Sequence, residues 1–118
     1  MGAKMITVYH NPNCSKSRGV LAILQERHVP FVSVEYLKAP PSRHDLENIL
    51  DLLLDAPNEL VRKDRLFREL ALNEDDCKTK EEIVTLLLRH PKLMERPVVV
   101  KGRKAIIARP SKRIEEFL

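Results

Sequence analysis

Apolar residues near the start of the chain predict a strand, a helix and a second strand. Residues 5–9 form a short apolar run that is typical of a buried strand. From 15 to 27 the apolar residues recur at helical spacing, until His28-Val29-Pro30 interrupts the pattern. Residues 31–36 alternate between apolar and polar, which is the period of a strand. Because the three elements follow one another so closely, we expect a βαβ unit with two parallel strands.

The middle of the chain predicts helices. Ser42 is followed three residues later by Asp45, and Thr79 is followed in the same way by Glu82. This is the spacing of a capping box, and apolar residues at helical spacing follow each pair. A less regular helical region lies between the two. We therefore expect a helical insertion over about residues 42–92.

The last part of the chain predicts a β-hairpin and a final helix. Residues 97–100 and 105–108 are apolar runs joined by a turn that contains Gly102, and Pro110 precedes the last helical segment. The simplest architecture is an α/β fold with a mixed four-stranded sheet and helices packed on it. The order β-α-β followed by β-β-α is that of a thioredoxin-like fold, here in a single domain over residues 1–118.

Composition and charge narrow the class of protein. A chain of 118 residues suits one domain, and residues 1–4 are left aside as a terminal remnant. The net charge of +4 is mild and the basic residues alternate with acidic ones, so we expect no nucleic acid as a partner. The apolar runs are too short to span a membrane. Two cysteines and no recognisable signal peptide favour the reducing cytoplasm.

Cys14 lies at the predicted turn between the first strand and the first helix. The N–H groups at a helix N-terminus favour an anion, and His10, Lys16 and Arg18 add positive charge nearby. These factors lower the pKa of a thiol, so we predict a reactive thiolate in preference to a buried structural cysteine. A C-x-x-C redox motif would have its second cysteine where Ser17 stands, so the thiol is alone.

Cys77 is a different case, because it follows the acidic run Asn73-Glu74-Asp75-Asp76. Neighbouring carboxylates disfavour a thiolate. We interpret Cys77 as an incidental loop cysteine, which would act as a resolving thiol only if the fold brought it near Cys14.

Two arginines, Arg96 and Arg109, each precede a proline and stand at the two ends of the predicted hairpin. A residue before proline is held in an extended conformation, which fixes the direction of its side chain. Guanidinium groups bind tetrahedral oxyanions through paired hydrogen bonds. The pattern alone fits an oxyanion-binding pair and a pair of solvated surface arginines alike.

Several short motifs share, in order, the pattern of one known family. They are residues 10–18 (H-N-P-N-C-S-K-S-R), Pro40-Pro41-Ser42-Arg43, Val61-Arg62-Lys63, His90-Pro91, Arg96-Pro97-Val98-Val99-Val100 and Arg109-Pro110-Ser111. Together they resemble the glutaredoxin-coupled arsenate reductase family, over about residues 6–118.

The resemblance implies a mechanism. Cys14 attacks arsenate, or a similar oxyanion, that three arginines hold: Arg62, Arg96 and Arg109. Glutathione then attacks the Cys14–arsenic adduct as a co-substrate, glutaredoxin returns the electrons, and arsenite is released. The family needs neither a bound cofactor nor a metal.

The resemblance also assigns three supporting residues. It implies that Pro97 is the cis-proline of the thioredoxin-like fold. His10 would lie beside the nucleophile and keep its pKa low, and Ser17 would hydrogen-bond around the thiolate loop.

Three alternatives share parts of this pattern. Spx-type regulators bind RNA polymerase with this fold, but Ser17 in place of a second cysteine and a chain that stops at Leu118 count against them. Phosphatase-like arsenate reductases have a C-x5-R loop, which Val20 excludes. A monothiol glutaredoxin-like oxidoreductase stays open, although three arginines argue for an inorganic oxyanion.

Overall fold

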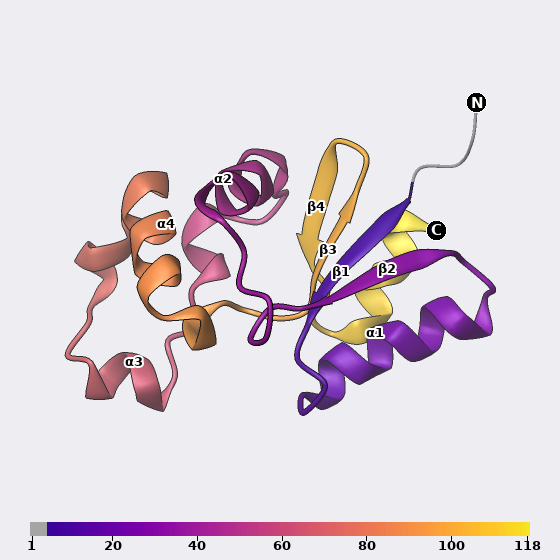
Figure 1. The fold of residues 1–118 in the computed structure, drawn as a ribbon, viewed down its shortest axis with the longest axis horizontal. Coiled ribbons are helices and arrows are strands. Elements are labelled where there is room, and N and C mark those ends of the chain that lie inside the picture. The colour runs from indigo at the N-terminus through magenta and orange to yellow at the C-terminus, as the bar shows by residue number, and fades with distance from the viewer. Residues whose placement is uncertain (1–4) are drawn as a thin grey trace.

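The structure is a computed structural model that describes residues 5–118, so residues 1–4, which the sequence prediction left aside, lie outside it. Figure 1 shows the path of the chain. In chain order the elements are β1 (Ile6–His10), α1 (Ser15–Glu26), β2 (Phe31–Glu35), α2 (Arg43–Leu52), η1 (Pro57–Leu60), α3 (Arg65–Glu69), η2 (Glu74–Cys77), α4 (Lys80–Arg89), η3 (Pro91–Leu93), β3 (Val98–Lys101), β4 (Lys104–Ile107) and η4 (Ser111–Phe117), where η denotes a 3₁₀ helix.

The four strands form one mixed sheet in the order β2-β1-β3-β4. Strand β1 is parallel to β2 and antiparallel to β3, and β3 is antiparallel to β4. The βαβ unit, the hairpin and the mixed four-stranded sheet of a thioredoxin-like fold are therefore confirmed. Strand β2 is an edge strand, which explains why Val32 is exposed although its segment alternates between apolar and polar.

Two hydrophobic clusters cover the two faces of the sheet. Alternate residues of β3 divide between them, since Val99 belongs to one cluster and Val98 to the other. On the first face, α1 and η4 pack on β1 and β4 through Ile6, Val8, Val20, Leu24, Ile106, Ala108, Ile114 and Phe117. The second face is covered by the helical insertion, and Figure 1 shows α2, α3 and α4 gathered at the opposite end of the molecule from α1.

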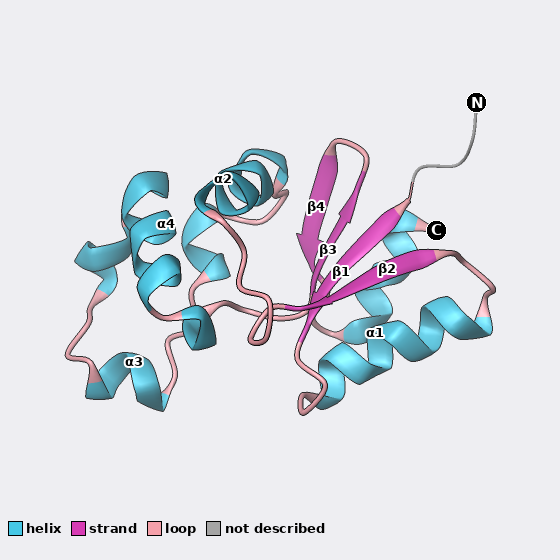
Figure 2. Ribbon diagram, in the orientation of Figure 1, coloured by secondary structure: helices cyan, strands magenta, loops and turns pink. Residues whose placement is uncertain are grey.

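The segment between β2 and β3 is built from helices and loops (Figure 2). Both predicted capping boxes are present: the N–H of Asp45 donates to Ser42 Oγ, and the N–H of Glu82 donates to Thr79 Oγ1, each at 3.1 Å. Between α2 and α4 the chain forms only short 3₁₀ helices and the five-residue α3. The final segment, predicted as a helix, is the 3₁₀ helix η4.

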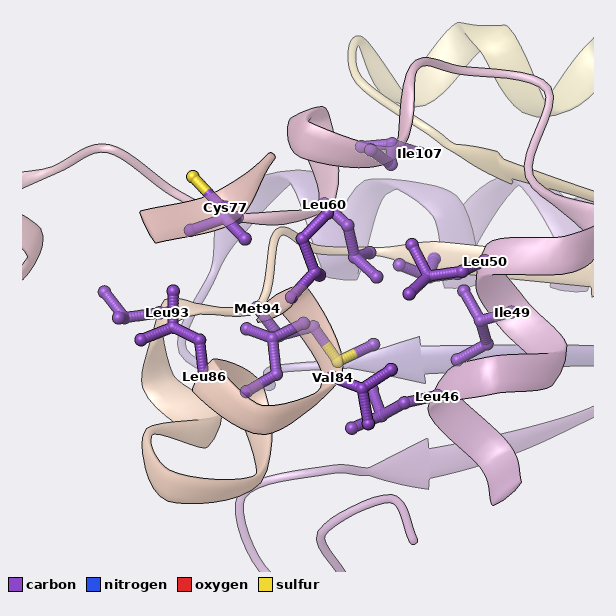
Figure 3. Packing of buried hydrophobic residues seen from close by; sticks show 14 of the residues in the cluster. Leu46, Ile49, Leu50, Leu60, Cys77, Val84, Leu86, Leu93, Met94 and Ile107 are labelled. Carbon is purple, nitrogen blue, oxygen red and sulfur yellow. The ribbon is translucent and has the colours of Figure 1, made fainter. Parts of the chain in front are cut away.

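Cys77 corrects one expectation. Its side chain is 1% exposed and belongs to the core of the insertion (Figure 3), so it is no incidental loop residue. Burial is the main reason why the pKa of the Cys77 thiol is raised, with smaller contributions from neighbouring carboxylates such as Glu74. A single turn of 3₁₀ helix carries too few residues to show an apolar period, so this burial could not be predicted from the pattern of apolar residues.

No helix within residues 5–118 is long and apolar enough to cross a membrane.

Candidate active site

Strand pairing brings three separate segments to one edge of the sheet. The first residue of β3 pairs with Tyr9 of β1 and with Ile107 of β4, so β1 ends, β3 begins and β4 ends at the same edge. The loop after β1 carries Cys14, while Arg96 precedes β3 and Arg109 follows β4. The topology therefore places these three side chains in one region.

Arg62 reaches this region from the helical insertion. An isolated antiparallel bridge pairs Val61 with Met94, two residues before Arg96. The N–H of Arg62 donates to the carbonyl of Leu93 at 2.7 Å, which fixes the backbone of the arginine beside the segment that leads into β3. The predicted trio of arginines thus comes from two distant parts of the chain.

The surroundings of Cys14 favour ionisation of its thiol. Cys14 is the N-cap residue of α1, and its own N–H donates to the carbonyl of Asn11 at 2.9 Å. Burial raises the pKa of the thiol, but hydrogen bonds from the backbone N–H groups of Ser17 and Lys16 lower it, as do a hydrogen bond and the charge of Arg96. The result is a pKa lowered to about 7, because fixed donors stabilise the thiolate.

Two guanidinium groups face the sulfur. Nη1 of Arg109 lies 4.0 Å from Cys14 Sγ and donates to the carbonyl of Arg96 at 3.0 Å. Nε of Arg96 is buried and has no hydrogen-bond partner among residues 5–118. Buried donors are usually paired, so this unpaired N–H is suited to an anionic ligand.

A carboxylate that sequence analysis missed lies among the arginines. Oε1 of Glu95 is 3.6 Å from Nε of Arg62 and 3.4 Å from Nη1 of Arg109. It also accepts a hydrogen bond from the N–H of Arg96 at 3.3 Å. Burial raises the pKa of Glu95, an effect that the charge of Arg109 opposes. The only local signal for Glu95 was its position next to Arg96 in E-R-P.

A cavity of about 260 Å³ adjoins the thiolate loop. Arg62 and Arg96 line it, together with Asn11, Tyr36, Lys92 and Asp64, whereas Cys14 and Arg109 are not among its lining residues. Tyr36 is completely buried, and its hydroxyl donates to the carbonyl of Met94 at 3.3 Å. The cavity is large enough for a tetrahedral oxyanion, and its cations supply the charge that such a ligand requires.

Ser17 supports the loop that carries the thiol. Its side chain is completely buried, and its Oγ accepts a hydrogen bond from the N–H of Asn11 at 3.2 Å. Its backbone N–H is one of the donors to Cys14. Ser17 therefore joins the start of α1 to the turn before it.

The three residues that were expected to add positive charge near Cys14 make other contributions in the structure. His10 is buried at the end of β1, and burial lowers its pKa despite the opposing charge of Glu35, which disfavours the charged form of the ring. Arg18 donates to the carbonyl of Pro12 at 2.9 Å, and Lys16 contributes a backbone N–H in place of its ammonium group. Whether His10 takes part in the chemistry stays a prediction.

The Arg96–Pro97 peptide bond is cis, which is the geometry that the resemblance implies for Pro97. The Arg109–Pro110 bond is also cis, and no sequence pattern predicted it. Within residues 5–118 no group of three or more His, Cys, Asp or Glu side chains is arranged to hold a metal ion.

Comparison with known proteins identifies the family of the chain. The ArsC family matches residues 9–117. An uncharacterised Escherichia coli K12 protein, YfgD, is 39% identical over 117 residues, which are 98% of each chain. An arsenate reductase from Neisseria meningitidis serogroup A is 37% identical over 115 residues, covering 96% of this chain and 97% of its own.

Comparison with solved structures points to the same family. An arsenate reductase from Vibrio cholerae superposes with a TM-score of 0.86 at 32% sequence identity, covering 99% of this chain and 100% of its own. The fold and the sequence therefore point to the same family.

Proposed function

Because the chain belongs to the ArsC family, we propose that it reduces arsenate to arsenite through Cys14, with glutathione and glutaredoxin as the source of electrons. The observation that carries the proposal is an ionisable thiol beside guanidinium groups. Cys14 has a pKa of about 7, and Nη1 of Arg109 lies 4.0 Å from its sulfur. A thiolate held among cations is suited to attack an anion, whereas a neutral thiol is too weak a nucleophile to do so.

The arginines bind the substrate and stabilise charge during the reaction. Arsenate is a tetrahedral oxyanion, and guanidinium groups donate paired hydrogen bonds to such oxygens. When the Cys14 sulfur bonds to arsenic, one arsenate oxygen takes up protons and leaves as water. Arg96 and Arg109 lie where they can hold the remaining oxygens, because both already contact or face the sulfur.

Two electrons must then reach arsenic. A glutathione thiolate attacks the Cys14 sulfur of the adduct, and the electron pair of the sulfur–arsenic bond stays on arsenic. Arsenic goes from As(V) to As(III), arsenite leaves, and Cys14 forms a mixed disulfide with glutathione. A glutaredoxin thiol removes the glutathionyl group and restores the Cys14 thiol.

An external thiol is required because the other cysteine is not accessible. Cys77 is 1% exposed in the core of the insertion, and burial raises its pKa, so it is unsuited to resolve the adduct. Glutathione and glutaredoxin act in reducing compartments, which makes the cytoplasm the expected location.

A coupled assay tests the proposal. The protein is mixed with arsenate, glutathione, glutaredoxin, glutathione reductase and NADPH, and NADPH oxidation is followed. We expect consumption that depends on arsenate and disappears in Cys14→Ser. If wild type shows thiol exchange but no dependence on arsenate, the proposal fails and a monothiol oxidoreductase takes its place. Retention of RNA polymerase subunits in a pull-down would point to a regulator.

A further inference from the structure

One carboxylate oxygen contacts all three arginines of the site. Oε1 of Glu95 lies 3.6 Å from the guanidinium of Arg62, 3.4 Å from that of Arg109 and 3.3 Å from the backbone N–H of Arg96. The proposed mechanism gives this carboxylate no step, since no contact between Glu95 and the Cys14 sulfur is found among the described residues.

The charges of the site explain why a carboxylate is needed there. Guanidinium groups brought together repel one another, and the repulsion is largest before an oxyanion has bound. Within residues 5–118, Arg109 forms an ion pair only with Glu95, and Arg62 forms ion pairs only with Glu95 and Asp64. Asp64 also caps α3 through the N–H of Phe67. Glu95 is thus the carboxylate that Arg62 and Arg109 share.

The distances leave the side-chain donors of Arg62 free for a ligand. Charge-assisted hydrogen bonds between guanidinium and carboxylate are typically about 2.7–2.9 Å long. The contacts of Glu95 with Arg62 and Arg109 are longer, and among the described residues the Arg62 side chain donates no hydrogen bond. Glu95 therefore offsets the charge of the arginines without using the N–H groups that an oxyanion requires.

Glu95 is itself held firmly. Its backbone N–H donates to the carbonyl of Leu60 at 2.7 Å, across the bridge that also fixes Arg62. Its side chain is 22% exposed, and the charged groups that face it are those of Arg62, Arg109, Asp64 and Lys63. A carboxylate with so little freedom can fix the direction of the side chains around it.

We propose that Glu95 is a positioning residue that holds Arg62 and Arg109 in the directions in which they receive the oxyanion. This inference rests on the proposed function, since it assumes that the arginines bind the substrate. Glu95 acts through the arginines and does not touch the reacting sulfur.

The direction in which arsenate binding changes in a Glu95 variant distinguishes a positioning role from a purely electrostatic one. Replacing Glu95 with glutamine removes a negative charge beside an anion site, and by charge alone this would strengthen the binding of arsenate. If Glu95 positions the arginines, the same change lets them separate and weakens binding. We expect the KM for arsenate to rise about fivefold to tenfold in Glu95→Gln, with kcat within about threefold of wild type.

Two further variants complete the kinetic test. Glu59→Gln removes the same charge from an exposed residue that lines the cavity beside Glu95 and Arg109, and should leave KM within about twofold. Glu95→Asp keeps the carboxylate but shortens its reach, and should give an intermediate KM. An unchanged or lower KM in Glu95→Gln would overturn the proposal.

A spectroscopic measurement does not depend on turnover. The Nε–H signal of Arg62, assigned by its loss in Arg62→Lys, should be sharp in wild type and broadened in Glu95→Gln, while the backbone spectrum shows that the variant is folded. An unchanged Arg62 signal overturns the positioning role even if arsenate is reduced. A broadened signal in a protein that fails to reduce arsenate would retain the positioning role and reject the function.

Discussion

Nη1 of Arg109 lies 4.0 Å from the sulfur of Cys14, although 95 residues separate the two along the chain. The contact exists because β1 and β4 both end at the edge of the sheet where β3 begins. A thiol at the start of a helix is thereby joined to a cation from the far end of the sequence.

The reactivity of Cys14 should depend on pH near neutrality. Its pKa is lowered to about 7, so the thiolate forms as the pH rises through that value, well below the range of an ordinary cysteine. The rate of alkylation by iodoacetamide, followed by intact mass, should reach half its maximum near pH 7. A midpoint near that of free cysteine would show that the donors around the sulfur do not lower the pKa of the thiol.

The free energy of unfolding should also depend on the ionisation of Cys14. The pKa of Cys14 is lower in the folded protein than its ordinary value of 9.0, so the folded state is favoured once the thiolate forms. The free energy of unfolding of wild type relative to Cys14→Ser should increase as the pH rises from about 7 to about 9, and the gain should disappear below pH 7. Denaturant titrations at several pH values measure this difference, and a constant difference would contradict the prediction.

Loss of Arg96 should raise the pKa of Cys14. In Arg96→Gln the thiolate loses a hydrogen bond and a positive charge. A rise of one unit would reduce the thiolate fraction at pH 7 from about one half to about one tenth. Arg103→Gln is the matched control, because Arg103 is exposed in the turn at the opposite end of β3. An equal effect of both variants on the alkylation profile would show that Arg96 has no specific contact with the sulfur.

Replacement of Cys77 should affect stability and leave catalysis intact. The side chain is buried in a hydrophobic cluster, so the hydroxyl of Cys77→Ser should lower the free energy of unfolding by about 1–3 kcal/mol. Cys77→Ala, which buries no polar group, provides the comparison. Both variants should retain the arsenate-dependent rate of wild type when folded. Lost turnover in a folded variant would give Cys77 a redox role.

The sequence was most informative where a motif is local. Cys14 and Ser17 stand three residues apart at the start of α1, and Arg96 and Arg109 each precede a proline, so these positions are conspicuous in the sequence alone. The role of Ser17 came from the family resemblance, and the local pattern of the two arginines fitted a surface pair equally well. Arg62 could be identified only through the family resemblance. Its placement depends on the bridge between residues 61 and 94, which leaves no trace in apolar periodicity.

Other features required the three-dimensional structure. Glu95 matters because of what surrounds it in space, and a carboxylate beside an arginine is common in any sequence. The lowered pKa of His10 follows from burial, which its position in the sequence did not reveal. Cys77 was interpreted as an incidental loop cysteine because its segment shows no apolar period, whereas its side chain packs into the core.

In the proposed mechanism, the Cys14 sulfur takes part directly in the reduction of arsenate. A single-turnover reaction with arsenate and glutathione, without glutaredoxin, tests it when arsenite is quantified and the modified residue is located by mass spectrometry. We expect one arsenite per protein molecule and one glutathionyl group on Cys14. Arsenite formed while Cys14 remains an unmodified thiol, or a glutathionyl group on Cys77 alone, would contradict it.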